Sequence, residues 1–375
     1  MIFKHFMRKM VVILLYVFLC LGGVFIGFLN LNPQFGSNPS SIQKENYSKY
    51  ENYFNEKFQN IEETILATDD ISMANFFRRD SNRVPQKEID HDLINSKSFT
   101  SLKNNSIRFA WLGHSAFIFN IENKLIMLDP MLTEYASPIP ISSLKRFGPD
   151  PEKVLSIKDL DSIDAVIFSH DHYDHLDYNS IKILKDKVKK YYVPIGLGNH
   201  LSDWGVNSKL ITELNWNEKS KYHNIEIVCL PSRHFSGRGP FNRNSTLWAS
   251  WAILSEDGKV YFSGDSGYGK HFKDIGQKYG PFDIVLIDSG QYNKAWKHSH
   301  MFPNEAVLAA KDLKAKYFMP IHWGAFVLST HEWDEPVNES VLYAKRFNQR
   351  IITPKIGQVL ELSKINKKLI SWWDN

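Results

Sequence analysis

The chain is poor in cysteine and has no strong excess of charge. Its 375 residues include two cysteines, Cys20 and Cys229, which excludes the disulfide framework of a small secreted scaffold. The formal net charge is +4 and no tract of lysine and arginine stands out, so nucleic acid is not an expected partner. A hydrophobic content of 43% is ample for a packed core, and the length fits one large domain or two small ones.

Charged residues are also missing over residues 10–29, directly after a basic segment at residues 1–9. Twenty apolar residues at 1.5 Å per residue can span the hydrocarbon core of a bilayer, so we expect a transmembrane anchor. A cleaved signal peptide is the alternative, but its apolar core is usually shorter and no A-x-A site follows. The basic N-terminus favours a single-pass protein whose catalytic domain lies outside the cytoplasm.

Residues 30–100 read as a linker and N-terminal extension, and residues 101–375 as the main domain. Residues 30–41 are rich in Asn, Pro, Gly and Ser, which is typical of a linker. The segment 47–67 carries a loose stripe of aromatic and isoleucine residues that predicts a helix with one packing face. Short apolar strands and helical patterns then alternate, which supports an α/β fold in general.

Histidine and aspartate gather after the apolar run 165–168, which predicts a buried strand. The next residues, 169–175, read Ser-His-Asp-His-Tyr-Asp-His. Ligand sites of open α/β sheets lie at the carboxyl ends of strands. Neutral imidazole and carboxylate are natural zinc ligands, so this stretch predicts a metal centre. A solvated polar loop with incidental histidines is the alternative.

Three further residues of the same kind follow other predicted strands. They are His234 after the strand at 225–230, Asp265 after a strand that begins at Val260, and His322 at the end of the strand from Tyr317. Because each lies at a strand end, as the first cluster does, we expect them to converge on it.

The segment 169–177 resembles the signature of the metallo-β-lactamase fold. Its flanking segments resemble, more narrowly, the hydrolases related to N-acyl-phosphatidylethanolamine-hydrolysing phospholipase D. These segments are Pro231-x-x-His234, Leu247-Trp-x-Ser-Trp251 and Ile321-His-Trp-Gly324. The resemblance covers residues 105–345 and implies a four-layer αβ/βα sandwich with metals at one edge.

The resemblance also implies two metal ions held by seven ligands, with zinc as the leading metal and iron or manganese as alternatives. The first ion would take His170, His172 and His234, the second Asp174, His175 and His322, and Asp265 would bridge both. The ions would share a hydroxide that attacks phosphorus or a carbonyl carbon. Other residues are expected to support this chemistry: Asp129 beneath the metals, His114 at the site floor or bracing its turn, and His300, with Asp174, as a catalytic group.

Substrate contacts are expected from Arg146, Arg238, Arg243 and His331. The three arginines lie in long loops, and guanidinium suits an anionic phosphate. For Arg146 an ordinary surface loop is the alternative, and for His331 a capping loop before a helix.

We therefore expect a phosphodiesterase of phospholipase D type that acts on N-acyl-phosphatidylethanolamine-like lipids. A lactonase or another ester hydrolase of the fold is the alternative, and a di-iron redox enzyme or a metal-free binding module would be other classes. The expected partners are a phospholipid or other phosphodiester and a membrane. The oligomeric state is left open.

Overall fold

Two mixed β-sheets form the body of the protein. The computed structural model describes residues 2–68, 82–100, 106–365 and 371–374. The first sheet has the strand order β15 (Leu360–Glu361), β3 (Arg108–Trp111), β4 (Phe117–Ile121), β5 (Lys124–Leu128), β6 (Ala165–Ile167), β7 (Tyr191–Pro194) and β8 (Ile211–Leu214). The second has the order β14 (Tyr317–Ile321), β13 (Ile284–Asp288), β12 (Gly258–Phe262), β11 (Ser250–Ser255), β10 (Ile225–Leu230) and β9 (Lys219–Tyr222).

Strand direction brings several strand ends to a common edge of each sheet. Strands β5 to β8 are parallel to one another, as are β12 to β14. The remaining pairs in both sheets are antiparallel. Because the carboxyl ends of parallel neighbours lie together, the loops that follow β5, β6, β12, β13 and β14 can build one site.

The core lies between the two sheets, and a second apolar layer lies behind β10 to β14. Along β10, Ile225, Ile227 and Cys229 join the large core shared with the first sheet. Val228 and Leu230 face the other way, into a cluster with residues of α8 and α9. This two-residue alternation is what a strand buried on both faces requires.

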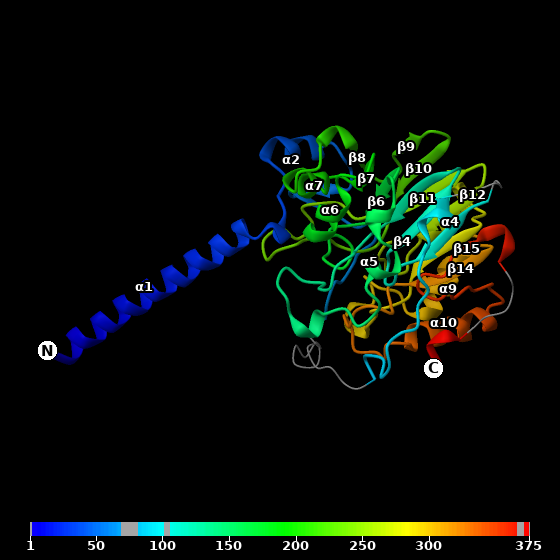
Figure 1. Cartoon of the computed structure of the whole chain (residues 1–375). Helices are drawn as coiled ribbons and strands as arrows, with labels where there is room; N and C mark the ends of the chain where they lie inside the picture. The colour runs from blue at the N-terminus through cyan, green and yellow to red at the C-terminus, as the bar shows by residue number, and fades with distance from the viewer. Residues whose placement is uncertain (1, 69–81, 101–105, 366–370, 375) are drawn as a thin grey trace.

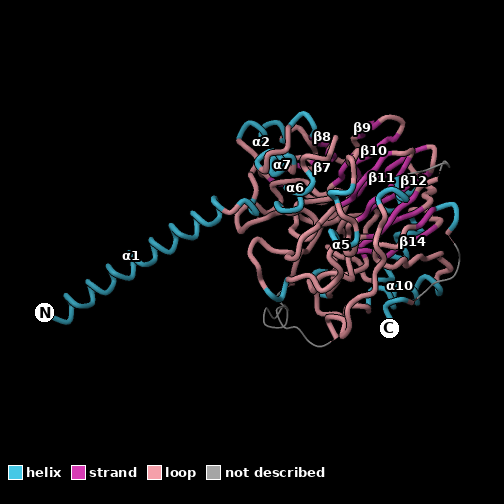
Figure 2. Tube along the Cα trace, viewed as in Figure 1, coloured by secondary structure: helices cyan, strands magenta, loops and turns pink. Residues whose placement is uncertain are grey.

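Helices cover the outer faces of the sheets, as Figure 2 shows for the whole chain. In Figure 1, α6 and α7 lie beside β7 and β8, whereas α9 and α10 lie beside β14. Helices thus lie on the outer faces of the two packed sheets, which confirms the expected four-layer αβ/βα sandwich. The bounds of these helices are α4 (Ser96–Thr100), α5 (Pro151–Val154), α6 (Tyr178–Leu184), α7 (Gly198–Asp203), α8 (His271–Lys278), α9 (Pro303–Asp312) and α10 (Glu335–Arg346).

Helix α1 (Ile2–Leu31) projects away from the domain as a straight rod (Figure 1). Its segment His5–Leu31 is long and apolar enough to cross a membrane, and it is not buried against the rest of the chain. Twenty-seven helical residues extend about 40 Å at 1.5 Å per residue, more than the hydrocarbon core requires. A signal sequence near the N-terminus can also be long and apolar enough to meet this criterion.

Residues 32–68, which we call the strap, lie against the domain. The predicted helix at 47–67 is wrong, because helix α2 (Ser41–Tyr47) ends where that prediction begins. A small hairpin of β1 (Tyr53–Phe54) and β2 (Lys57–Phe58) follows. The aromatic residues of this segment do pack together: Tyr47, Tyr53 and Phe58 contact one another with ring centroids 4.8–5.7 Å apart.

The strap is expected to contribute to the stability of the domain through Phe58. Its side chain is fully buried in the large core, whereas Phe54 of the same hairpin is 66% exposed. Replacing a buried phenylalanine by alanine costs about 3–5 kcal/mol of unfolding free energy. We predict a loss of this size for Phe58→Ala in chemical denaturation, with little change for the control Phe54→Ala. Equal stability of the two variants would contradict the packing.

Candidate metal centre

Three imidazoles converge on one point at the edge of the sheets. Nε2 of His170 lies 2.8 Å from Nδ1 of His172, and Nε2 of His234 lies 3.1 Å from the same atom. The Oδ2 atom of Asp265 lies 3.6 and 3.7 Å from these two Nε2 atoms. The four ligand atoms lie within 4.8 Å of one another, so they form a set of the size that holds one cation.

A second group lies on the other side of Asp265. The Oδ1 atom of Asp265 is 3.1 Å from Nε2 of His175 and 3.1 Å from Nδ1 of His322. The Oδ2 atom of Asp174 lies 3.4 Å from His175 Nε2 and 2.8 Å from Nε2 of His114. The structure therefore brings together all seven residues that the sequence proposed as ligands, and it adds His114 to the second group.

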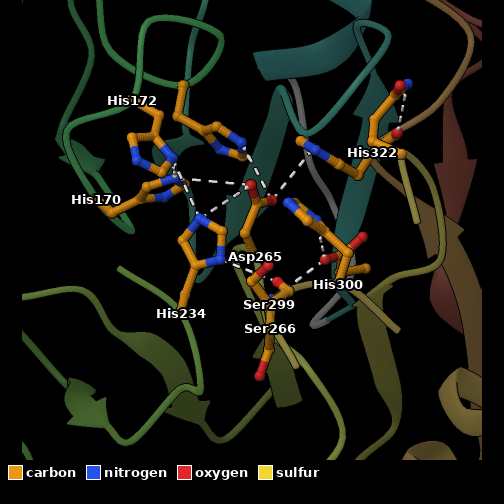
Figure 3. Close-up of polar contacts among 12 residues, drawn as sticks. His170, His172, His234, Asp265, Ser266, Ser299, His300 and His322 are labelled. Carbon is orange, nitrogen blue, oxygen red and sulfur yellow. Dashed lines mark hydrogen bonds and ion pairs between the residues drawn. The ribbon is translucent and has the colours of Figure 1, made fainter. Parts of the chain in front are cut away.

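Asp265 joins the two groups because each of its oxygens faces one of them. Figure 3 shows its carboxylate between His170, His172 and His234 on one side and His322 on the other. Gly264 permits this position: a Cβ at Gly264 would lie 2.4 Å from the Cβ of Ser169, and its φ is +55°. Only glycine accepts both the contact and this φ without strain.

In the first group, His170 and His234 direct unprotonated ring nitrogens at the centre. His170 Nδ1 donates to Ser169 Oγ, which itself donates to Asp129. His234 Nδ1 donates to the Ser299 carbonyl at 2.9 Å. The Nε2 atom of each ring is then the unprotonated one, since burial lowers the pKa of both imidazoles well below the usual value. Unprotonated nitrogens that face a common centre suit a cation.

The second group stabilises positive charge. Burial lowers the pKa of His175, but the carboxylates of Asp265 and Asp174 outweigh burial and raise that pKa well above its usual value. His175 Nδ1 donates to Asp129 Oδ2 at 2.7 Å, so its Nε2 faces the group. Within the described residues, neither His175 Nε2 nor Asp265 Oδ1 has a hydrogen-bond partner. A divalent cation would satisfy both atoms, and the residues present therefore fit a metal.

The backbone is strained where it supports these residues. Asp129, His114 and His322 have φ values of +37°, +56° and +70°, in a region that non-glycine residues avoid. His114 and His322 also pair through their backbones, since His322 N–H donates to the His114 carbonyl at 3.2 Å. Asp129 accepts from Ser169 and His175, which gives it the supporting position beneath the metal ligands that was expected.

His300 lies beside the two groups and is oriented by Asp288, the last residue of β13. Its Nδ1 is 2.9 Å from Asp288 Oδ2, and its ring stacks on His322 at 5.1 Å. Burial raises the pKa of Asp288 to about 7. Burial lowers the pKa of His300, but the adjacent Asp288 outweighs it and raises the pKa overall. This pair therefore retains a proton next to the candidate metal ligands.

A pocket of about 300 Å³ opens over these residues. Its polar lining residues include His172, Asp174, Asp265, His300 and His322. Its apolar lining residues are Leu66, Ala67, Phe235, Trp296 and Leu328, and Arg243 also lies in the lining. A substrate whose polar reacting group carries apolar substituents would fit such a lining.

Comparison with known proteins agrees with the fold. Residues 126–323 match the family model described as "Beta-lactamase superfamily domain". A protein of Mycobacterium tuberculosis is 39% identical over 268 residues, which is 70% of this chain and 71% of the relative. The chain belongs to the metallo-β-lactamase superfamily.

Two further similarities accompany this match, and the structural one shows the fold alone. N-acyl-phosphatidylethanolamine-hydrolyzing phospholipase D 1 of Caenorhabditis elegans is 37% identical over 235 residues, covering 60% of this chain and 65% of the relative. The solved structure of Igni18, a metallo hydrolase of Ignicoccus hospitalis, covers 68% of this chain and 98% of its own, with a TM-score of 0.52 and 20% identity. This metallo-β-lactamase-fold protein is thus a metal-dependent hydrolase.

The expected arginine contacts are corrected in two cases. Arg238 is 2% exposed, and its guanidinium donates to the carbonyls of Asp171, Leu176 and Gln34. It therefore braces the ligand loop 169–177 from behind and does not line the pocket. Arg146 donates to the carbonyls of Thr133 and Met131 and lies over the Phe326 ring at 4.4 Å, so the structure does not bring it into the pocket.

Arg243 does line the pocket. Its guanidinium carbon lies 5.1 Å from the centre of the Phe235 ring, and among the described residues it has no hydrogen-bond partner. It can therefore accept an anion. His331 stacks on Tyr292 at 4.6 Å and donates from Nδ1 to the Glu332 carbonyl. It is not among the residues that line this pocket, and it lies in the loop before α10.

Two supports of the site escaped the sequence analysis. Asp288, described above, was not among the predicted site residues. Asp171 lies between two ligands but points away from them and accepts from Gly237 N–H, Thr246 Oγ1 and His200 Nε2. Neither residue stands out in the sequence, because its role depends on partners 12 to 75 positions away.

Removing one oxygen of the bridge should disrupt both metal positions. In Asp265→Asn, an uncharged amide replaces the carboxylate, and one of its ends can only donate. We predict that the zinc-loaded protein carries about two ions per chain and that this variant carries about one or fewer, measured by elemental analysis. Asp274→Asn in α8, whose carboxylate is exposed and pairs with Lys270, is the matched control. Two retained ions in Asp265→Asn would contradict the bridging role.

Proposed function

We propose that this protein is a zinc-dependent phosphodiesterase of phospholipase D type that cleaves N-acyl-phosphatidylethanolamine-like lipids. The observation that carries the proposal is the Asp265 carboxylate, whose two oxygens face two separate groups of metal-ligating side chains. The substrate class is proposed because a relative 37% identical is named for this hydrolysis. The pocket supports a lipid substrate because both polar and apolar residues line it.

The first ion would be held by His170, His172, His234 and Asp265, and the second by Asp174, His175, His322 and Asp265. His114 would hold the Asp174 carboxylate in place. A pair of divalent ions supplies a nucleophile by lowering the pKa of water, and it offsets charge on phosphate oxygens. Zinc is proposed because the set is rich in imidazole.

The remaining residues would bind the phosphate and supply a proton. Arg243 at the pocket rim can donate to the phosphate from its guanidinium. His300 uses Nδ1 in its contact with Asp288, which leaves Nε2 as the nitrogen available to the pocket. We propose that Nε2 gives its proton to the leaving alkoxide, while Asp288 keeps the ring in one orientation and stabilises its protonated form.

Helix α1 is proposed to anchor the enzyme as a single-pass membrane protein. Its length and exposed apolar surface support this role. The basic residues near its start favour a cytoplasmic N-terminus and an extracytoplasmic catalytic domain. An anchor would hold the pocket near its lipid substrates and raise their local concentration.

The other function classes have less support. A metal-free binding module would not require seven intact ligands in one place, and all seven are present. A di-iron redox enzyme could use a similar ligand set, and a lactonase could use the same polar groups. Turnover of N-acyl-phosphatidylethanolamine, bis(4-nitrophenyl) phosphate and an acyl-homoserine lactone by the zinc-loaded protein separates these functions. Lactone cleavage alone would overturn the proposal.

The role of His300 can be tested through the leaving group. We predict that His300→Ala lowers kcat for the lipid by about 10²–10⁴-fold, the usual contribution of a general acid. The loss should be much smaller for bis(4-nitrophenyl) phosphate, because nitrophenolate leaves without a proton. Metal content should be unchanged, and His223→Ala, in an exposed turn, is the control. Equal losses on both substrates would exclude His300 as the proton donor.

A further inference from the structure

The strap connects the end of α1 to the catalytic pocket. Asn32 Nδ2 donates to the Pro138 carbonyl at 3.0 Å, close to α1. At the other end, Thr68 N–H donates to the Ala295 carbonyl at 2.9 Å, next to the pocket-lining Trp296. The strap lies outside residues 126–323, which match the family model, so the shared ligand signature does not account for it.

Asn60 ties the strap to a predicted metal ligand. Its Nδ2 donates to the His234 carbonyl at 2.7 Å, and its Oδ1 accepts from His234 N–H at 3.1 Å. The same oxygen accepts from Trp248 Nε1 at 3.1 Å. The amide thus pairs with both backbone groups of His234 as a neighbouring strand would, which fixes the strap relative to the metal groups.

Three further contacts hold the segment between Asn60 and the pocket. Arg233 Nε donates to Thr64 Oγ1 at 3.1 Å, and its Nη2 donates to the Glu63 carbonyl. Ile65 N–H donates to His298 Nδ1 at 3.1 Å. The backbone leading into the pocket wall is therefore held on both sides of Glu63.

The strap supplies apolar surface to the pocket through Leu66 and Ala67. Both line it together with Phe235, Trp296 and Leu328, and His172 and Asp265 line the same pocket. Ile65, the residue before them, is 51% exposed and does not line the pocket. Leu66 is thus the large aliphatic side chain that the strap places in the pocket.

We propose that Leu66 and Ala67 are specificity-determining residues that pack against a hydrocarbon chain of the substrate. The assignment rests on the proposed phosphodiesterase function, because the phosphate must lie at the candidate metal ligands for the hydrocarbon chain to reach the strap. An apolar chain that leaves water against this wall gains binding free energy with each buried methylene group. The residues that follow the anchor would then select which lipids the pocket accepts.

The experiment compares Leu66→Trp, which fills the space at the wall, with Ile65→Trp, which adds the same side chain outside it. Leu66→Ala removes the wall and serves as the second variant if the tryptophan disturbs folding. All are full-length, zinc-loaded proteins in non-ionic detergent, checked by elemental analysis and thermal unfolding. Calorimetry measures binding of dodecyl phosphate and of inorganic phosphate. Kinetics compare a long-chain phosphodiester with bis(4-nitrophenyl) phosphate.

Leu66→Trp should weaken dodecyl phosphate binding, relative to inorganic phosphate, by about tenfold or more, the effect of small changes in an apolar pocket. The preference in kcat/KM for the long-chain diester should fall in parallel. Leu66→Ala should shift both ratios in the same direction, and Ile65→Trp should match the wild type. Wild-type ratios in both Leu66 variants would overturn the proposal. If the binding effect appears but no phosphodiester is cleaved, the apolar wall stands and the proposed function fails.

Discussion

The structure depends on one buried carboxylate that faces histidines on both sides. Asp265 is 3% exposed, and its Oδ1 atom makes no hydrogen bond among the described residues, although His175 Nε2 and His322 Nδ1 each lie 3.1 Å away. An ionised carboxylate in such a position is costly unless positive charge accompanies it. The neighbouring rings cannot all supply that charge, because burial keeps His170, His234 and His322 neutral. Two cations, one at each oxygen, would resolve this imbalance.

The sandwich delivers these groups to one place through its strand ends. The ligand loop follows β6, His234 follows β10, Asp265 follows β12 and His322 follows β14. Each strand is held by buried neighbours on both faces, so the loops begin from fixed positions. Contacts behind the ligands then fix their direction: Arg238 holds the carbonyls around the ligand loop, and Asp129 holds His175. Such supporting contacts orient metal ligands before the metal binds.

The sequence predicted the fold class and singled out the proposed metal ligands, because the signals for both are local. A dense run of histidine and aspartate after an apolar strand is visible without knowledge of any distant residue. The residues that support the ligands were not predicted, because their roles depend on partners that are distant in the sequence. Arg238 resembles a phosphate ligand in a glycine-rich loop until its carbonyl partners are known, and Asn60 is an ordinary asparagine until His234 lies beside it. The stripe at 47–67 misled because aromatic spacing does not distinguish a helix from a hairpin that packs on itself.

The most direct test of this account is a crystal structure of the zinc-loaded protein with anomalous scattering measured at the zinc edge. The account predicts two zinc peaks about 3.5–4 Å apart, with the two oxygens of Asp265 directed at different ions. A single peak, or two peaks that do not share Asp265, would contradict it.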